Sequence, residues 1–533
     1  MSSNKKKLSV KSPSPRPPNS SDDVMKPDQG VGTPPSNVPN ETDDCFTVDE
    51  AIEHFGFGWF QILISLFAGV SWMAEAMEMM ILSILSPALS CEWGIGNAEQ
   101  AIITSCVFCG MMFSSIIWGK VCDRYGRRIG IMLISMTTFF FGMCSAFAPN
   151  YPVFIILRTL MGVGIGGVPQ SVTYYSEFLP MKQRAKCVML MQAFWALGGA
   201  VESCVAIFVM EPFGWRCLLI ISTMPLLISA ATCLCVPESA RFLMTCGRNE
   251  DAYKTIKMIS RMNKREMPRG KLIVSRDTTK NMEKKRGNFF DLFRPEFLRT
   301  TILLLTIWFI ITASYYGIIL YTTVLYTSGV TCHGAKPNST SSLLACMPLT
   351  QDDYFDFVLT SVSEFPGLLL SAILLELIGR RKTVAVDLLC FSVFVAVLAL
   401  CLERFYVTTA LFITRAFASG AFQSIYVYTP EVYPTTMRAV GLGAASGMGR
   451  LGALLTPFVA QVMSSIWLLF PVVLYSGFGI LAACCAIALK IETRGRQMQD
   501  HMEEAISASR PKEEQGQQEK NSQLNLAAMN CGD

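Results

Sequence analysis

Seven glutamate and arginine side chains lie deep inside long apolar runs of the sequence. A charged side chain in hydrocarbon costs roughly 2.5–3.5 kcal/mol on insertion scales, so such residues usually pair or face a cavity. Carboxylates in that setting exchange protons and bind cations, and guanidinium groups bind anions. The seven residues therefore predict ion binding and proton transfer within a membrane. They are Glu75, Glu78, Glu202, Glu364, Arg158, Arg415 and Arg450.

Glu75 and Glu78 are three residues apart, which places them on one face of a helix. Glu75 lies roughly 15 Å from the predicted helix end, near the middle of a bilayer. Two neighbouring carboxylates cannot both ionise cheaply there, so one is expected to hold a proton near neutral pH. That property suits a proton-coupled carrier. The alternative is a structural ion pair with an arginine such as Arg158.

Two charged residues of the second half lie beside helix-weakening residues. Pro366 and Gly367 follow Glu364, which suits gating or coupling, although a buried, permanently protonated glutamate is the alternative. Arg450 lies among glycines that allow close helix packing, and it still needs a partner or an anionic substrate. Five aromatic residues either line a cavity that binds a cation or pack the core: Trp72, Trp195, Trp308, Tyr315 and Tyr316.

Twelve apolar segments of about 20 residues position these side chains, and each is long enough to cross a bilayer. Only 16% of the residues are charged, against roughly 25% in an average soluble domain. The sequence therefore predicts an all-α membrane protein with twelve transmembrane helices. They are expected at 59–85, 98–121, 129–149, 152–175, 186–209, 213–236, 299–327, 354–378, 383–402, 406–428, 439–462 and 466–489.

Three motifs recur in the same order about 250 residues later, which indicates two pseudo-symmetric six-helix halves. A Tyr-x-x-Glu-x-x-Pro-x-x-x-Arg motif begins at Tyr174 and again at Tyr428. An acidic residue precedes Gly-Arg-Arg between the second and third helices of each half. Glu238 and Glu492 follow the last helix of each half. Parallel repeats of this kind place a substrate site between the halves.

The repeated arginines and glutamates predict a gate at one end of the helices. Such charge networks form in one conformation and break in another. The alternative is that the basic residues only anchor the loops on the cytosolic side. The candidate gate residues are Gly119, Asp123, Gly126, Arg127, Arg128, Glu177 and Arg184 in the first half, and Glu376, Gly379, Arg380, Arg381, Glu431 and Arg438 in the second.

Lysine and arginine are concentrated in alternate loops, so we expect the gate loops and both termini in the cytosol. The predicted parts are a disordered cytosolic tail (1–45), a first half (46–236), a central cytosolic loop (237–298), a second half (299–490) and a second cytosolic tail (491–533). The extracytosolic loop after the seventh helix carries a sequon at Asn338. Cys332 and Cys346 in that loop form a disulfide or remain two free thiols.

The run GKVCDRYGRR at 119–128 resembles the signature loop of the major facilitator superfamily, and PESARF at 237–242 resembles its sugar and organic-ion porter branch. Other segments, such as YTPEVYPTTMRA at 428–439, resemble a synaptic and secretory vesicle branch of this superfamily. The resemblance implies alternating access and a vesicle membrane. Ala372 replaces the leading glycine of the second loop motif, and the spacing around Arg415 differs from that around Arg158.

We therefore expect a secondary active transporter of a small organic ion, coupled to protons. Neither an enzyme nor a cofactor is expected, and a Walker motif for ATP is lacking. The helix-7 pattern of hexose carriers is also lacking, which disfavours a plain sugar carrier. The expected partners are the substrate, protons and the lipid bilayer, without nucleic acid, and the chain is expected to be a monomer. The alternative is a transport-inactive regulator or scaffold of a vesicle membrane.

Overall fold

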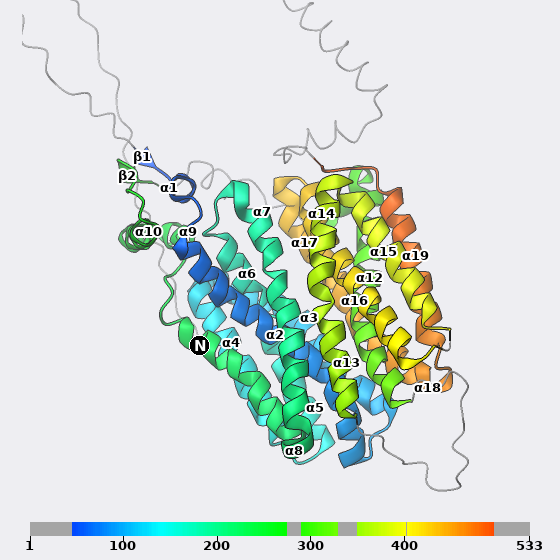
Figure 1. Cartoon of the computed structure of the whole chain (residues 1–533). Helices are drawn as coiled ribbons and strands as arrows, with labels where there is room; N and C mark the ends of the chain where they lie inside the picture. Colours follow the sequence, from blue (N-terminus) through cyan, green and yellow to red (C-terminus); the bar gives the residue numbers. More distant parts are fainter. Residues whose placement is uncertain (1–44, 274–288, 329–348, 401, 495–533) are drawn as a thin grey trace, which may run out of the picture. The chain divides into compact units, whose positions relative to one another are not determined.

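The computed structural model describes residues 45–273, 289–328, 349–400 and 402–494, and most of these residues are helical (Figure 1). Within this part of the chain, nine helical segments are long and apolar enough to cross a membrane. They are Trp59–Trp93 (α2), Asn97–Tyr125 (α3), Arg127–Ala146 (α4), Tyr151–Ser176 (α5 and α6), Lys186–Thr232 (the end of α7, and α8), Pro295–Thr327 (α12), Gln351–Leu377 (α13 and α14), Arg404–Val432 (α16) and Phe470–Ala488 (α19).

The remaining membrane crossings are found in a bent helix and in two long helices of lower apolar character. α8 (Gln192–Thr232) is bent at Gly214, whose φ of 75° is not helical, and the whole segment has the length of two crossings. α15 (Arg380–Val397) and α17 (Thr435–Pro457) are also long, but charged residues or glycines lower their apolar character. A π-helical turn, η2 (Phe458–Met463), continues α17. The predicted all-α fold with twelve crossings is confirmed.

Several helix boundaries differ from the prediction. α2 extends to Trp93, beyond the expected end at residue 85. The fourth segment is divided into α5 (Tyr151–Ile165) and α6 (Pro169–Ser176), and the eighth into α13 (Gln351–Val362) and α14 (Glu364–Leu377). The second break precedes Pro366, which lacks the N–H that would continue the helix ladder.

The expected central loop contains secondary structure. α9 (Ala240–Thr245) and α10 (Asn249–Asn263) follow the first half, and a 3₁₀ turn, η1 (Phe289–Phe293), precedes α12. Strand β1 (Cys45–Phe46) pairs in parallel with β2 (Lys271–Leu272). Helix α1 (Val48–Phe55) follows β1 in the chain. Buried residues of α1, α9 and α10 share one apolar cluster. Short helices α7 (Met181–Leu190) and α18 (Ser464–Ile466) complete the elements.

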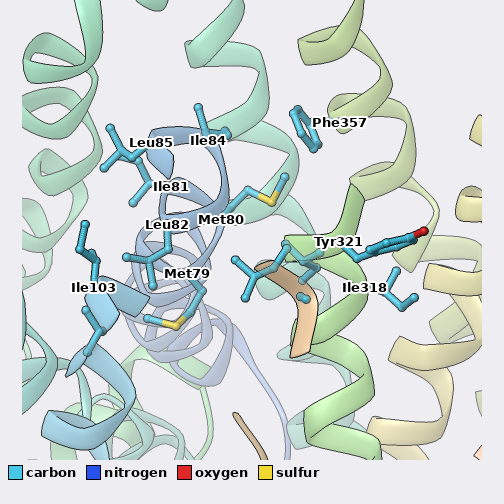
Figure 2. Close-up of a cluster of buried hydrophobic side chains, with 14 of the residues drawn as sticks. Met79, Met80, Ile81, Leu82, Ile84, Leu85, Ile103, Ile318, Tyr321 and Phe357 are labelled. Carbon is cyan, nitrogen blue, oxygen red and sulfur yellow. The ribbon is translucent and has the colours of Figure 1, made fainter. Parts of the chain in front are cut away.

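α2 packs against helices of both halves. Its segment from Met79 to Leu85 is buried on all sides, as expected for a helix enclosed by other helices. Figure 2 shows these side chains between Ile103 of α3 and the residues Ile318, Tyr321 and Phe357 of α12 and α13. This apolar contact closes the space between the halves along this stretch. Glu78 immediately precedes this segment, and Glu75 lies about one turn before it.

The glycine run of the fourth segment allows close helix packing. A Cβ atom on Gly162 would collide with the backbone of Val107 in α3, and one on Gly164 would collide with Thr138 in α4. Backbones can approach this closely only when side chains are absent. The run therefore joins α3, α4 and α5, and it positions Arg158, which lies one turn before Gly162.

Candidate functional site

A small cavity of about 70 Å³ lies between the halves, with side chains of both halves around it. Its walls are mainly aromatic, and all five aromatic residues proposed from the sequence line it. The lining includes Trp72, Trp195, Trp308, Tyr315, Tyr316, Phe108, Phe422 and Tyr426. This volume holds a few water molecules, whereas sites for drug-sized ligands span roughly 300–1,000 Å³. The cavity in this structure is therefore smaller than a site for a drug-sized ligand.

Glu75 and Arg450 bring opposite charges to this cavity, one from α2 and one from α17. The Glu75 side chain is buried, and its Oε2 atom has no hydrogen-bond partner. Arg450 donates from Nη1 to the carbonyl oxygen of Met111 at 2.7 Å. Arg450 acts on Glu75 electrostatically, but they form no ion pair in the described part of the chain. Both groups therefore retain bonding capacity for a ligand.

Glu78 has different partners from Glu75, although both lie on α2. Arg158 donates from Nη1 to Glu78 Oε2 at 3.0 Å, and both side chains are fully buried. Glu202 lies near the same arginine and accepts a hydrogen bond from Ser222 at 2.7 Å. The reason is helical geometry, because a step of three residues still turns the side chain by about 60°. Glu78 forms the ion pair that was the alternative.

The second half holds a comparable buried pair. Arg415 donates from Nε to Glu364 Oε1 at 2.9 Å, and the Tyr315 hydroxyl donates to the same oxygen at 2.9 Å. The Trp195 indole of the first half donates to the Tyr315 hydroxyl at 2.8 Å. Glu364 therefore connects to the cavity wall through Tyr315. Despite its different spacing, Arg415 pairs with a buried glutamate as Arg158 does.

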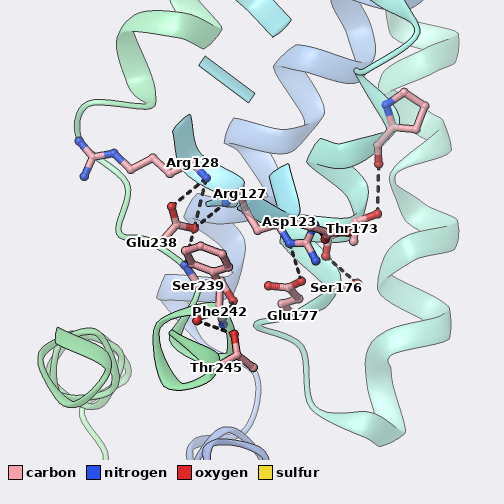
Figure 3. Close-up of polar contacts among 11 residues, drawn as sticks. Asp123, Arg127, Arg128, Thr173, Ser176, Glu177, Glu238, Ser239, Phe242 and Thr245 are labelled. Atoms are coloured by element: carbon pink, nitrogen blue, oxygen red, sulfur yellow. Dashed lines mark hydrogen bonds and ion pairs between the residues drawn. The ribbon is translucent and has the colours of Figure 1, made fainter. Parts of the chain in front are cut away.

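The gate motif of the first half forms a connected polar cluster (Figure 3). Arg127 pairs with Asp123 at 2.7 Å and with Glu177 at 3.1 Å. The Glu238 carboxylate accepts the backbone N–H groups of Arg127 and Arg128 at 2.9 and 3.2 Å. Burial raises the pKa of Glu238, while these N–H bonds oppose the rise. Glu238 thus satisfies N–H groups at the start of α4, which have no partner within the helix.

The second half repeats this arrangement around Arg380. Arg380 pairs with Glu431 at 3.2 Å, and its backbone N–H donates to Glu492 at 2.9 Å. The glycine before the arginine has positive φ in both halves, 106° at Gly126 and 93° at Gly379. A Cβ on either glycine would also meet the capping carboxylate. Glycine is required at both positions for conformation and for space.

The other candidate gate residues mostly hold backbone carbonyls. Arg128 donates to Leu234 and Arg381 to Leu489, at the ends of the last helix of each half. Arg184 donates to the Leu179 carbonyl at 3.3 Å, and Arg438 donates to that of Pro430 at 2.8 Å. Glu376 does not repeat the role of Asp123, because it pairs with Lys186 at 3.7 Å. A Cβ on Gly119 would meet only the tip of Gln170, at 3.9 Å.

The arginine–glutamate pairs of the gate motifs join helices within one half and do not cross between halves. On the side of the basic loops, the described residues contain one ion pair that joins the two halves. It is the exposed pair of Lys186 and Glu376. Beyond the cavity, Gln461 of η2 donates to Ser86 of α2 at 3.0 Å, and Ser105 donates to the Leu454 carbonyl at 2.8 Å. The halves are therefore joined more firmly away from the basic loops.

Sequence reasoning did not identify the roles of three carboxylates. Glu238 and Glu492 were recognised as repeated residues, but their capping role depends on the contact with the start of α4 and α15. Asp387 lies within a predicted apolar helix and is fully buried in α15. Its charge among apolar neighbours was the signal that could have identified it.

Some predicted residues cannot be placed. Asn338, Cys332 and Cys346 lie outside the described residues. Cys91, near the end of α2, is disulfide-bonded and was not singled out from the sequence. In the ranges that the structure describes, no group of three His, Cys, Asp or Glu side chains is arranged to hold a metal ion.

Comparisons with known proteins agree with the fold. A family model described as "Sugar (and other) transporter" matches residues 95–505. The putative transporter svop-1 of Caenorhabditis elegans is 49% identical, over 88% of this chain and 90% of that protein. The synaptic vesicle 2-related protein of Xenopus laevis is 50% identical, over 88% of this chain and 85% of that protein. The predicted resemblance to the superfamily and to its vesicle branch is confirmed.

The fold is similar to that of the xylose transporter XylE from E. coli. A partially occluded, inward-open structure of XylE matches with a TM-score of 0.65 and 17% identity, covering 82% of this chain and 99% of that chain. Another structure of XylE, described as a proton:xylose symporter, matches with a TM-score of 0.59. At this identity the likeness shows the shared fold alone.

Proposed function

This chain belongs to the sugar (and other) transporter family of the major facilitator superfamily, and on that premise we propose that it carries a small organic ion by secondary active, proton-coupled transport. The observation that supports this most is the placement of Glu75 and Arg450. These residues come from opposite halves, and both line the cavity between them. A ligand bound to both groups would sense any movement of one half against the other, as alternating access requires.

The cavity chemistry favours an organic cation or a zwitterion. Aromatic ring faces attract cations, most strongly where water is excluded, and eight aromatic side chains line this site. Glu75 supplies an anionic partner for an ammonium group. Arg450 supplies a cationic partner for a carboxylate in a zwitterion. A neutral sugar would offer no counter-charge to either group, so it fits less well.

Glu75 is the side chain best placed to couple substrate to protons. Its Oε2 atom is buried and has no hydrogen-bond partner, whereas Glu78 and Glu364 are held by arginines. A carboxylate that binds either a proton or the cationic group of the ligand makes the two events mutually dependent. In this proposal, proton release from Glu75 prepares the cavity for the cation, and protonation expels the cation.

The membrane and the orientation belong to the same proposal. The name of the Xenopus laevis relative refers to synaptic vesicles, and we infer a vesicle membrane for this chain. The described part of the chain begins at Cys45 in β1, which pairs with β2. It ends at Arg494, two residues after Glu492, which caps the start of α15. Both ends therefore lie on the side of the basic loops. That side is proposed to face the cytosol. We further propose that the chain acts as a monomer.

Counterflow in proteoliposomes tests the function directly. The purified chain is reconstituted and loaded in turn with unlabelled quaternary amines, amino-acid zwitterions, organic anions and sugars. Uptake of the matching labelled compound is then followed. We expect counterflow of a cation or zwitterion, and Arg450→Met should weaken zwitterions more than simple cations. Absence of counterflow for every class would favour the transport-inactive scaffold.

A further inference from the structure

Asp387 is a buried carboxylate that neither the cavity nor the gate pairs use. It lies in α15, and its side chain is fully buried. Its Oδ2 atom accepts hydrogen bonds from Ser371 of α14 at 3.0 Å and from Ser424 of α16 at 3.3 Å. Its Oδ1 atom has no hydrogen-bond partner. The carboxylate therefore lies where three helices of the second half meet.

This junction is in register with the second-half gate. Arg380 of α15 pairs with Glu431 of α16, and Asp387 and Ser424 each lie seven residues farther into the bundle along their own helices. Seven residues are about two helical turns, or roughly 10 Å. The Asp387 contact and the gate ion pair thus join the same two antiparallel helices at successive levels. The two contacts are therefore near enough, on the same pair of helices, for a change at one to affect the other.

No cation neutralises Asp387 in the described part of the chain. Ser371 faces it from α14 and Ser424 from α16, and α19, which also packs on α15, carries no Asp, Glu, Lys or Arg. On α15 itself, the Cys390 thiol is the nearby titratable group that senses Asp387. The charged neighbours on the packed helices are already paired, as Glu364 with Arg415, Glu376 with Lys186 and Glu431 with Arg380.

The first half is built without this carboxylate. A Cβ on Gly420 would meet Ser371 and Asp387, whereas one on Gly167 in the first half would meet Trp118 and Ile134. Ile134 lies seven residues after Arg127, as Asp387 lies seven after Arg380. The position that corresponds to Asp387 is therefore occupied by isoleucine in the first half and by a carboxylate in the second. The fold does not require an acid there, and its presence needs another explanation.

We propose that Asp387 is a proton site that controls the second-half gate, which rests on the proton-coupled function proposed above. With a proton on Oδ1, the carboxyl is neutral, and α14, α15 and α16 pack closely around it. Loss of that proton to water on the side of the basic loops leaves a buried, unpaired negative charge, which is costly. The junction then loosens, and the Arg380–Glu431 contact two turns away is weakened.

Hydrogen exchange of the full chain in lipid nanodiscs tests this proposal without a known substrate. Exchange is measured by mass spectrometry for peptides spanning 380–387 and 424–432, from about pH 5 to about pH 8, and corrected for the intrinsic pH dependence of amide exchange. In the native chain, protection of both peptides should fall as pH rises, by up to about tenfold per pH unit for a single proton. Asp387→Asn should hold protection at its low-pH level throughout.

Two further variants keep the test decisive. Asp387→Ile copies the residue found in the first half, and it should remove the pH dependence as Asp387→Asn does. Ser392→Ala, on the same helix, breaks a polar contact of α15 with α19 but titrates nothing, so the native pH response should persist. The proposal is wrong if protection in the native chain does not vary with pH, or if both Asp387 variants respond as the native chain does.

The exchange result and the transport result can fail separately. If a pH gradient drives no uptake but Asp387→Asn removes the pH response of both peptides, the proton site at the gate stands and the proposed coupling falls. If uptake is proton-driven and the peptides do not change with pH, the coupling stands and Asp387 is a structural residue only.

Discussion

Arg158 offers a quantitative test of how the first half holds its buried charges. Its guanidinium is fully buried and cannot lose its proton, so it always requires a counter-charge. Glu78 supplies one at 3.0 Å, and Glu202 lies near enough to supply a second. Glu78→Gln and Glu202→Gln each replace one carboxyl group near Arg158 by an amide with little change of shape. Each single variant still leaves one carboxylate beside Arg158.

The expected changes in the free energy of unfolding depend on how many carboxyl groups remain near Arg158. A single variant should lower the free energy of unfolding by about 1 kcal/mol, the typical net value of one hydrogen bond. The double variant leaves a buried cation unpaired, which costs about 3–5 kcal/mol. The coupling between the two sites should therefore be at least about 1 kcal/mol.

The second half supplies a matched comparison. Glu364 is the ion-pair partner of Arg415 in the described residues, and no second carboxylate is paired with it. Glu364→Gln alone should then cost about 3–5 kcal/mol, as much as the double variant in the first half. Reversible unfolding of each variant in mixed micelles, titrated with a denaturing detergent, measures these values. Additive effects of Glu78→Gln and Glu202→Gln, to within about 0.5 kcal/mol, would refute the shared counter-charge.

Three further outcomes are expected. Arg127→Ala and Arg380→Ala should each slow or trap the conformational switch while the chain still folds, and unchanged accessibility labelling of both faces in both variants would contradict a gating role. Mass mapping should find one glycan at most, on Asn338, whereas a glycan on Asn19 or Asn40, which begin two further sequons in the first tail, would overturn the proposed topology. Gly162→Val should lower the free energy of unfolding by about 1–3 kcal/mol through collision with the Val107 backbone, measured by the same detergent titration.

The crossing helices could be predicted from the sequence because their length and apolar character are local properties. The breaks were harder to place, since the kink at Gly214 and the split before Glu364 depend on how each segment packs. The pairing of Arg127 with Glu177, and of Arg380 with Glu431, follows from the repeat. The sequence could not show that these pairs stay within one half, because that requires the relative positions of six helices.

The intramembrane charged residues could likewise be predicted only in part. Their presence predicts ion pairs and a cavity, but partners depend on the direction in which each side chain points. Glu75 and Glu78 illustrate this, since three residues separate a cavity carboxylate from a buried ion pair. Asp387 was visible as a charge in an apolar run. Its contact with Ser371 and Ser424 joins three helices that are separated in the chain, so only the structure could show it.

Proton-driven accumulation by the native chain and by Glu75→Gln is the most direct test of the central claim. Proteoliposomes with an imposed pH gradient are supplied with a labelled compound identified by counterflow. The native chain should concentrate the compound against its gradient, and collapse of the pH gradient should abolish accumulation. Glu75→Gln should lose uphill accumulation, whereas Glu78→Gln should retain it, because Glu78 belongs to the ion pair with Arg158. Undiminished, pH-dependent accumulation by Glu75→Gln would show that coupling resides elsewhere.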